Sequence, residues 1–233
     1  MEARQKTIGM IGGMSWESTA EYYRLANQLT RDRLGGLHSA SVLIASVDFA
    51  EIEEFQSRGE WSLAGAQLAE VARSLETAGA ELLILCTNTM HKVAPAIEAA
   101  VSIPFLHLAD ATATAVRAAG IRTVGLLGTA FTMEQDFYRE RLRGHGLEVV
   151  VPGEEDRALV HRVIYDELCR GLVGEESRAE FTRIIGLLAD RGACGVILGC
   201  TEIELLVGPE HSPIPTFPTS RLHIEAAIAA SFS

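Results

Sequence analysis

The chain has 233 residues, of which 48% are hydrophobic and 22% are charged, so it can bury a sizeable core in one large or two small domains. Its formal net charge of −11 at pH 7 argues against nucleic acid and anionic membrane surfaces as partners. No apolar run reaches the roughly 18 residues that a membrane-spanning helix needs. The first residues, Met1 to Gln5, show no signal-peptide pattern, and we therefore expect a cytoplasmic protein.

The four cysteines indicate free thiols; they are Cys86, Cys169, Cys194 and Cys200. Their spacing fits neither a zinc site nor a C-x-x-C redox pair, and cytosolic cysteines are normally reduced. The sequence also contains no phosphate-loop motif, no metal-ligand cluster and no lysine context typical of pyridoxal phosphate enzymes. We therefore expect neither a metal nor a cofactor.

In chain order, the first half of the sequence predicts alternating strands and helices. Residues 6–12 read as a buried parallel strand, followed by a glycine turn and a helix that starts with a capping box at residues 18–21. The backbone N–H groups of this turn could bind an anion, or the glycines could serve only to turn the chain tightly. Further strands are expected at 42–47, 81–86 and 103–108, and further helices at 62–78, from residue 90, and at 110–119.

The second half, from Arg122, predicts the same alternation. Strands are expected at residues 124–128, 148–151 and 194–200, and helices at 154–170, 175–191 and 221–230. We expect the last helix to return to the first half and pack there.

Three pairs of segments look like copies of each other: 6–12 with 122–128, 84–89 with 197–202, and 103–105 with 214–217. Any two α/β units share the pattern of strand, glycine and helix, but the three matches together favour an internal duplication of roughly 100 residues per unit. We therefore predict an α/β protein of two similar αβα domains. Each has a parallel sheet of about four strands, the two are related by a pseudo-twofold axis, and the active site lies between them. The expected domains are residues 1–108 with 212–233, and residues 109–211.

Thiol and hydroxyl side chains follow two of the repeated strands, where open α/β sheets bind ligands. The copies can be aligned in two ways. Matching Ile84-Leu85 to Ile197-Leu198 places Thr87 opposite Cys200, whereas matching the Cys-Thr pairs places Cys86 opposite Cys200. The first alignment pairs one thiol with one hydroxyl, and the second pairs two thiols. Neighbouring strand residues point to opposite faces, so the alignment decides which side chain belongs to the site.

Two opposed acid–base groups suit the inversion of a carbon stereocentre without a cofactor, because one face of the carbon needs a base and the other an acid. A thiol has an unperturbed pKa of about 8.5, which a helix N-terminus can lower, so a cysteine can act as thiolate base and thiol acid. Hydrogen-bond donors from Asn88, Thr89 and Thr201 would bind the substrate carboxylate as its charge grows in the transition state.

The chain resembles the aspartate/glutamate racemase superfamily over essentially its full length. Three motifs carry the resemblance: residues 8–15 (IGMIGGMS), 87–91 (TNTMH) and 199–202 (GCTE). The sequence is most similar to the enteric-type amino-acid racemases for aspartate and glutamate. This resemblance implies two α/β domains with four-stranded parallel sheets, racemisation without pyridoxal phosphate, a small amino-acid substrate and a homodimer.

The resemblance also implies roles for individual residues. Most relatives have a catalytic cysteine directly before the asparagine, where this chain has Thr87, so it resembles a subgroup that favours L-enantiomers. Cys200 matches the second catalytic cysteine, which works on the L-face. Cys169 stands where several aspartate-preferring relatives have a lysine, so Gln56, Arg58 or Lys92 could bind the distal carboxylate instead. The predicted substrate-binding set is Met14, Ser15, Gln56, Asn88, Thr89, Cys169, Thr201 and Glu202.

Two alternatives to an aspartate/glutamate racemase stay open at this stage. One is another reaction on the same scaffold, such as isomerisation or decarboxylation of a small dicarboxylate, for which one thiol is sufficient. The other is an amino-acid-binding protein with little catalysis, because a threonine hydroxyl is a much weaker acid than a thiol.

Overall fold

The computed structural model describes residues 4–233, which form two compact units: residues up to 108 together with 223–233, and residues 109–222. Met1, Glu2 and Ala3, part of the N-terminal stretch in which no signal-peptide pattern was found, lie outside the described residues. Residues 212–222, which we expected in the first unit, belong to the second. The reason is that β8 (Thr216–Pro218) pairs in parallel with β7 (Val196–Gly199).

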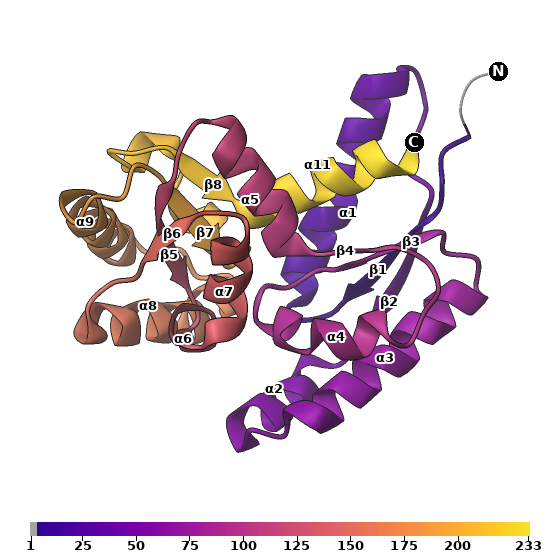
Figure 1. Ribbon diagram of the computed structural model, residues 1–233, viewed down its shortest axis with the longest axis horizontal. Coiled ribbons are helices and arrows are strands. Elements are labelled where there is room, and N and C mark those ends of the chain that lie inside the picture. The colour runs from indigo at the N-terminus through magenta and orange to yellow at the C-terminus, as the bar shows by residue number, and fades with distance from the viewer. Residues whose placement is uncertain (1–3) are drawn as a thin grey trace. The chain divides into compact units, whose positions relative to one another are not determined.

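The first unit is built on a parallel sheet of strand order β2-β1-β3-β4 (Figure 1). Its strands are β1 (Ile8–Gly12), β2 (Val42–Ser46), β3 (Leu82–Leu85) and β4 (Phe105–Leu106). Its helices are α1 (Trp16–Leu34), α2 (Phe49–Arg58), α3 (Trp61–Thr77), the 3₁₀ helix η1 (Thr89–Val93), α4 (Ala94–Glu98) and most of α11 (Thr219–Ser231).

Helices cover both faces of this first sheet. Leu82, Ile84 and Cys86 pack with residues of α1 and α11, whereas Leu83 and Leu85 pack with residues of α2, α3 and α4. This alternation along β3 is the two-residue period expected of a strand buried on both faces. The expected return of the C-terminal helix to the first unit is confirmed, because Ile224, Ala227 and Ile228 lie in the same cluster as Ile8.

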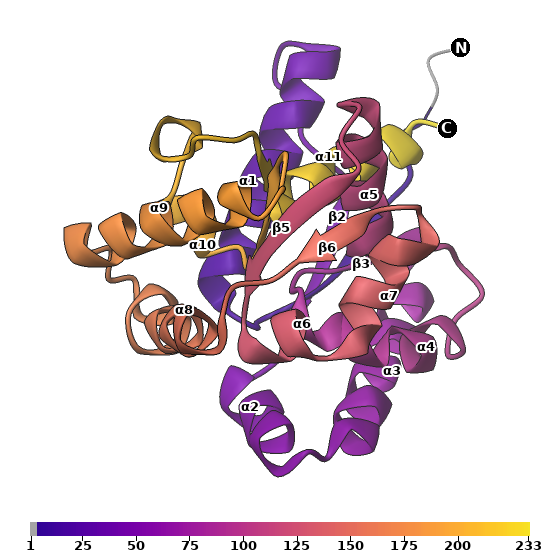
Figure 2. The same cartoon turned by 60° about the vertical axis from the view of Figure 1, so that its left-hand side comes forward.

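The second unit repeats the arrangement with a parallel sheet of order β6-β5-β7-β8. Its other strands are β5 (Thr123–Gly128) and β6 (Glu148–Val150). Its helices are α5 (Leu108–Ala118), α6 (Ala130–Glu134), α7 (Asp136–Gly144), α8 (Glu154–Asp166), η2 (Leu168–Arg170), α9 (Glu175–Asp190), α10 (Ile203–Leu206) and η3 (Pro209–His211). Helices α8 and α9 run in different directions in Figure 2, and their apolar residues share one core with Leu127, Val196 and Leu198.

The identical strand order confirms the predicted fold class, two sheets of four parallel strands each, and supports the internal duplication. None of the helices formed by residues 4–233 is long and apolar enough to cross a bilayer.

Two helices begin earlier than the sequence patterns indicated. The side chain of Ser15 accepts a hydrogen bond from the Ser18 amide at 3.2 Å, so α1 starts at Trp16 and the pattern at 18–21 is not its cap. Asp110 lies inside α5. Its carboxylate accepts hydrogen bonds from Arg141 at 2.7 and 2.6 Å and lies 2.8 Å from His145 Nε2, so it joins α5 to the end of α7.

Candidate active site

The glycine turn after β1 is held by hydrogen bonds within the chain. Gly13 has φ +94°, and a Cβ there would lie 2.1 Å from the Val47 carbonyl oxygen, so only glycine fits. The Gly13 amide donates to Thr19 Oγ1 at 2.8 Å, and the Ser18 amide donates to the Ser15 side chain. Two of the N–H groups that were candidates for anion binding are therefore already used. Met14 and Ser15, both predicted to bind substrate, are buried in this turn.

At the end of β3, the neighbouring residues Cys86 and Thr87 have side chains in different surroundings. Cys86 is completely buried in the cluster that contains Ile8 and Tyr22, and burial raises the pKa of its thiol. The Ser18 hydroxyl donates to the Cys86 carbonyl at 3.2 Å and ties α1 to this point. The next residue, Thr87, is half-buried. The side chain of Cys86 is therefore part of the core between the sheet and α1.

The pairing of strands decides between the two alignments of the repeat. In the first sheet Ile11 pairs with Leu85, and in the second sheet Leu127 pairs with Leu198. Residues 6–12 match residues 122–128, so Ile11 corresponds to Leu127 and Leu85 corresponds to Leu198. Counting onward, Cys86 corresponds to Gly199 and Thr87 to Cys200. Each sheet thus carries one chemically distinct group, a hydroxyl or a thiol, at the same position after its third strand.

His91 fixes the backbone of Thr87. Its Nε2 accepts a hydrogen bond from the Leu108 amide at 3.1 Å, so the ring proton is on Nδ1, which donates to the Thr87 carbonyl at 2.7 Å. The ring is buried and lies 4.4 Å, centroid to centroid, from that of His107. The sequence places His91 at the start of the helix expected from residue 90. In the structure it bridges the end of β3 to the segment after β4.

The second unit contains a comparable bridge. The Glu204 carboxylate accepts hydrogen bonds from the Ser220 amide at 3.2 Å and the Ser220 hydroxyl at 2.6 Å. Glu204 stands four residues after Cys200, as His91 stands four residues after Thr87. Different side chains therefore brace the same connection in the two copies, and sequence comparison alone does not reveal that.

The three candidates for the distal carboxylate have different surroundings. Gln56 is buried at the end of α2, with its amide nitrogen 3.0 Å from the Met90 sulfur. Arg58 is exposed and pairs with Glu54 along the same helix. Lys92 lies over the Trp61 ring, 3.7 Å from its centroid, and burial lowers its pKa. Of the three, Gln56 lies in the same buried region as Met14, since Met14 and Met90 belong to one cluster.

In the second unit, Cys200, Thr201 and Glu202 form a compact polar group after β7. The Cys200 thiol donates to Glu202 Oε2 at 3.0 Å, and the Thr201 hydroxyl donates to the same oxygen at 2.7 Å. Glu202 is only 4% exposed and Cys200 is half-buried. Cys169, at η2, packs against the same core and is close enough to influence the Cys200 thiol.

The expectation that a helix N-terminus lowers the pKa of Cys200 is wrong. Burial raises this pKa well above the ordinary value, and the negative charge and hydrogen bond of Glu202 raise it further. The helix that follows, α10, has only four residues, so its dipole is small. The sequence placed Glu202 near the substrate but did not show its bond to the thiol, because that bond depends on how the chain turns after β7.

The predicted site residues fall into two groups. Thr87, Asn88 and Thr89 follow β3, Met14 and Ser15 follow the neighbouring parallel strand β1, and Gln56 reaches Met90, which also follows β3. The other group, in the second unit, is Cys169, Cys200, Thr201 and Glu202. In residues 4–233 no three His, Cys, Asp or Glu side chains are arranged to hold a metal ion.

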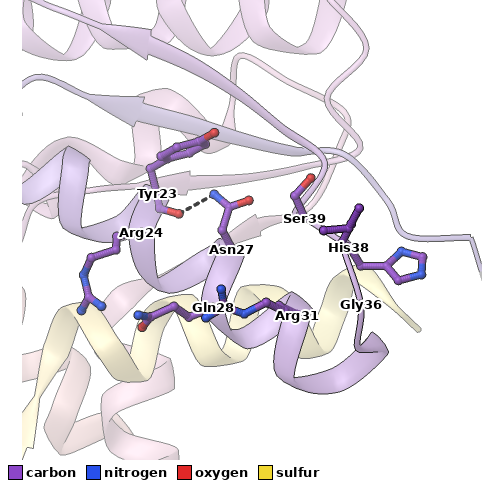
Figure 3. A pocket seen from close by; sticks show the side chains of 9 residues that line it. Tyr23, Arg24, Asn27, Gln28, Arg31, Gly36, His38 and Ser39 are labelled. Carbon is purple, nitrogen blue, oxygen red and sulfur yellow. Dashed lines mark hydrogen bonds between the residues drawn. The ribbon is translucent and has the colours of Figure 1, made fainter.

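A surface cavity of about 560 Å³ lies away from these residues, along α1 and the loop that follows it (Figure 3). Its lining includes Tyr23, Arg24, Asn27, Arg31 and His38, and the Asn27 amide donates to the Tyr23 carbonyl at 2.7 Å. It contains none of the predicted site residues.

Comparison with known proteins places the chain among racemases. A crystal structure of a proposed Asp/Glu racemase from Yersinia pestis is 51% identical, with 98% of this chain and 100% of that chain covered and a TM-score of 0.92. An aspartate racemase homologue from Pyrococcus horikoshii is 34% identical, with 98% and 100% covered and a TM-score of 0.86.

A curated relative matches over a shorter stretch. The broad specificity amino-acid racemase RacX of Bacillus subtilis is 33% identical over 79 residues, and the match spans only 34% of each chain. The sequence model of the Asp/Glu/hydantoin racemase family matches residues 11–227, most of the chain. The chain therefore belongs to the Asp/Glu/hydantoin racemase family and is an isomerase.

Proposed function

We propose that this protein is a cofactor-independent amino-acid racemase that acts on L-aspartate, L-glutamate or similar small amino acids. The names of its relatives support this substrate class, since two are described as a proposed Asp/Glu racemase and an aspartate racemase homologue. RacX, which is described as having broad specificity, supports the inclusion of other small amino acids.

The observation that carries the proposal is the equivalence of Thr87 and Cys200 in the two sheets. Racemisation removes a proton from one face of Cα and returns one to the other face. It therefore needs two groups that reach the same carbon, and a duplicated fold supplies such a pair from equivalent positions. Cys86 does not suit this role, because its thiol is buried in the core with Ile8 and Tyr22.

In the proposed reaction the sulfur of Cys200 removes the Cα proton of the L-enantiomer. The electron pair of the broken bond is delocalised into the α-carboxylate, where donors from Asn88 and Thr89 and the backbone N–H of Thr201 stabilise the developing charge. Thr87 lies on the opposite side of the carbon and delivers a proton through its hydroxyl, with a water molecule behind it. A hydroxyl is a poor base, so we expect D-substrates to react with a low kcat.

The structure favours Gln56 among the candidate partners for a substrate side-chain carboxylate. Arg58 is exposed and already paired with Glu54, and Lys92 is held over Trp61. A neutral amide discriminates less strongly by charge than a lysine or arginine would. We therefore expect several small polar amino acids to be accepted, with the dicarboxylic ones among them.

The proposal is tested by incubating the protein with each L- and D-amino acid and separating the enantiomers by chiral chromatography. The protein is first dialysed against a chelator and treated with a carbonyl reagent, so that activity cannot come from a metal or pyridoxal phosphate. Appearance of the opposite enantiomer supports the proposal. Release of carbon dioxide from a dicarboxylate would indicate a decarboxylase, and ligand-induced stabilisation without conversion would indicate a binding protein.

A further inference from the structure

The Glu202 carboxylate accepts hydrogen bonds from two donors of its own segment, a thiol and a hydroxyl. Its Oε2 accepts from the Cys200 thiol at 3.0 Å and from the Thr201 hydroxyl at 2.7 Å, while its side chain is only 4% exposed. Thr201 is buried as well. The hydrogen bond from Thr201 therefore holds the carboxylate against the Cys200 sulfur, and because the group is buried, water screens its charge weakly.

This arrangement poses a chemical problem for a base. The half-buried Cys200 hydrogen-bonds to a carboxylate, which stabilises the protonated thiol, but only a thiolate can remove a Cα proton. The proton on sulfur must therefore leave before the substrate reacts, and the acceptor already in contact with it is Glu202 Oε2.

We propose that Glu202 is the proton acceptor that activates Cys200, and that it is not a ligand of the substrate carboxylate. The inference rests on the proposed racemase function. An anionic Glu202 would repel the α-carboxylate of an amino acid, which makes binding of that group by this side chain unfavourable. Thr201 positions the carboxylate by donating to the oxygen that faces the thiol.

The proton transfers balance over one turnover. The S–H bond of Cys200 breaks, its proton moves to Glu202 Oε2, and the electron pair stays on sulfur. The thiolate then takes the Cα proton and becomes a thiol again, while the electrons of the C–H bond enter the substrate carboxylate. The opposite face of the carbon receives a proton from the Thr87 side. Glu202 then releases its proton to solvent, from which the Thr87 side is reprotonated.

The experiment compares the wild-type protein with Glu202→Gln, which keeps the size of the side chain and an oxygen that Thr201 can bond. The ionisation of Cys200 is followed as the rate of alkylation by iodoacetamide across roughly pH 6–10, with the modified cysteine identified by peptide mass mapping. The other titratable group that acts on this thiol is Cys169, which the substitution leaves in place. Cα proton exchange in deuterated water is measured in parallel.

Two effects of opposite sign are expected. Loss of the negative charge should move the alkylation midpoint of Cys200 down by about one to three pH units, so that alkylation below the midpoint becomes at least about tenfold faster. At a pH below the variant's midpoint, where its thiol is still protonated, loss of the proton acceptor should lower the exchange rate by about 100-fold or more. A purely structural role of Glu202 would not make the thiol more reactive while it removes activity.

Two further variants control the result. Glu204→Gln removes a carboxylate two residues away, one that accepts hydrogen bonds from Ser220, and it should leave the alkylation profile unchanged. Glu202→Asp keeps a carboxylate and should exchange faster than the Gln variant. An unshifted alkylation profile in Glu202→Gln overturns the inference, as does a shifted profile with undiminished exchange. If the wild type exchanges no amino acid, the proposed function fails, and the alkylation arm still tests whether Glu202 controls the thiol.

Discussion

Replacing His91 with alanine tests how firmly the backbone of Thr87 is held. The substitution removes two hydrogen bonds, from Nδ1 to the Thr87 carbonyl and from the Leu108 amide to Nε2. Each loss deprives a backbone group of a partner at a cost of about 1–3 kcal/mol, and the buried ring also loses its packing. We expect the free energy of unfolding to fall by about 3–5 kcal/mol in total.

The assay is urea unfolding, supported by calorimetry, in which a loss of this size corresponds to a Tm lower by about 10 °C. His38→Ala is the control, because this histidine is exposed and its loss should change stability by no more than about 0.5 kcal/mol. His91→Asn should keep the donor to Thr87, and His91→Gln should keep the acceptor for Leu108, so each should recover part of the loss. A loss below about 1 kcal/mol in His91→Ala would refute the reasoning.

Further predictions concern the Thr87 position and a second buried histidine. Thr87→Cys should create a two-thiol pair and raise the kcat for D-to-L conversion. Cys86→Ala should leave turnover nearly unchanged, because Cys86 belongs to the core. If Cys86→Ala lost activity while Thr87→Ala did not, Cys86 and not Thr87 would be the group opposite Cys200. Burial lowers the pKa of His223 to about 4, below its usual value of about 6.5. Its neutral form therefore supports the fold above pH ~6.5, and up to about 3 kcal/mol of stability should be lost as the pH falls toward 4. Urea unfolding at several pH values should show this slope in the wild type and a flatter one in His223→Gln; parallel curves would contradict it.

The sequence is sufficient to predict the strands that place the site, because buried parallel strands appear as continuous apolar runs. It leaves two alignments of the repeat open, and the one that matches the Ile-Leu pairs makes Thr87 correspond to Cys200, as does the resemblance to the racemase superfamily. The sheet pairing then gives the same correspondence independently.

The environment of Cys200 could not be predicted in the same way. A carboxylate two residues after a cysteine points toward the thiol or away from it, depending on the backbone turn between them, and no periodicity records that turn. The length of α10 could not be predicted from the sequence either. The sequence suggested a helix dipole that would lower the pKa of the thiol, but a helix of four residues has only a weak dipole. His91 and Asp110 depend on partners 17 and 31 residues away, respectively, in the chain.

The central claim, that Cys200 removes the Cα proton, is tested most directly by proton NMR of L-aspartate and L-glutamate in deuterated water. The wild type should replace the Cα proton by deuterium, and Cys200→Ser should slow this exchange by about 100-fold or more, as expected for the loss of a general base. Cys194→Ser, which alters an exposed thiol, should exchange like the wild type. Exchange by Cys200→Ser at the wild-type rate would contradict the assignment of Cys200 as the base.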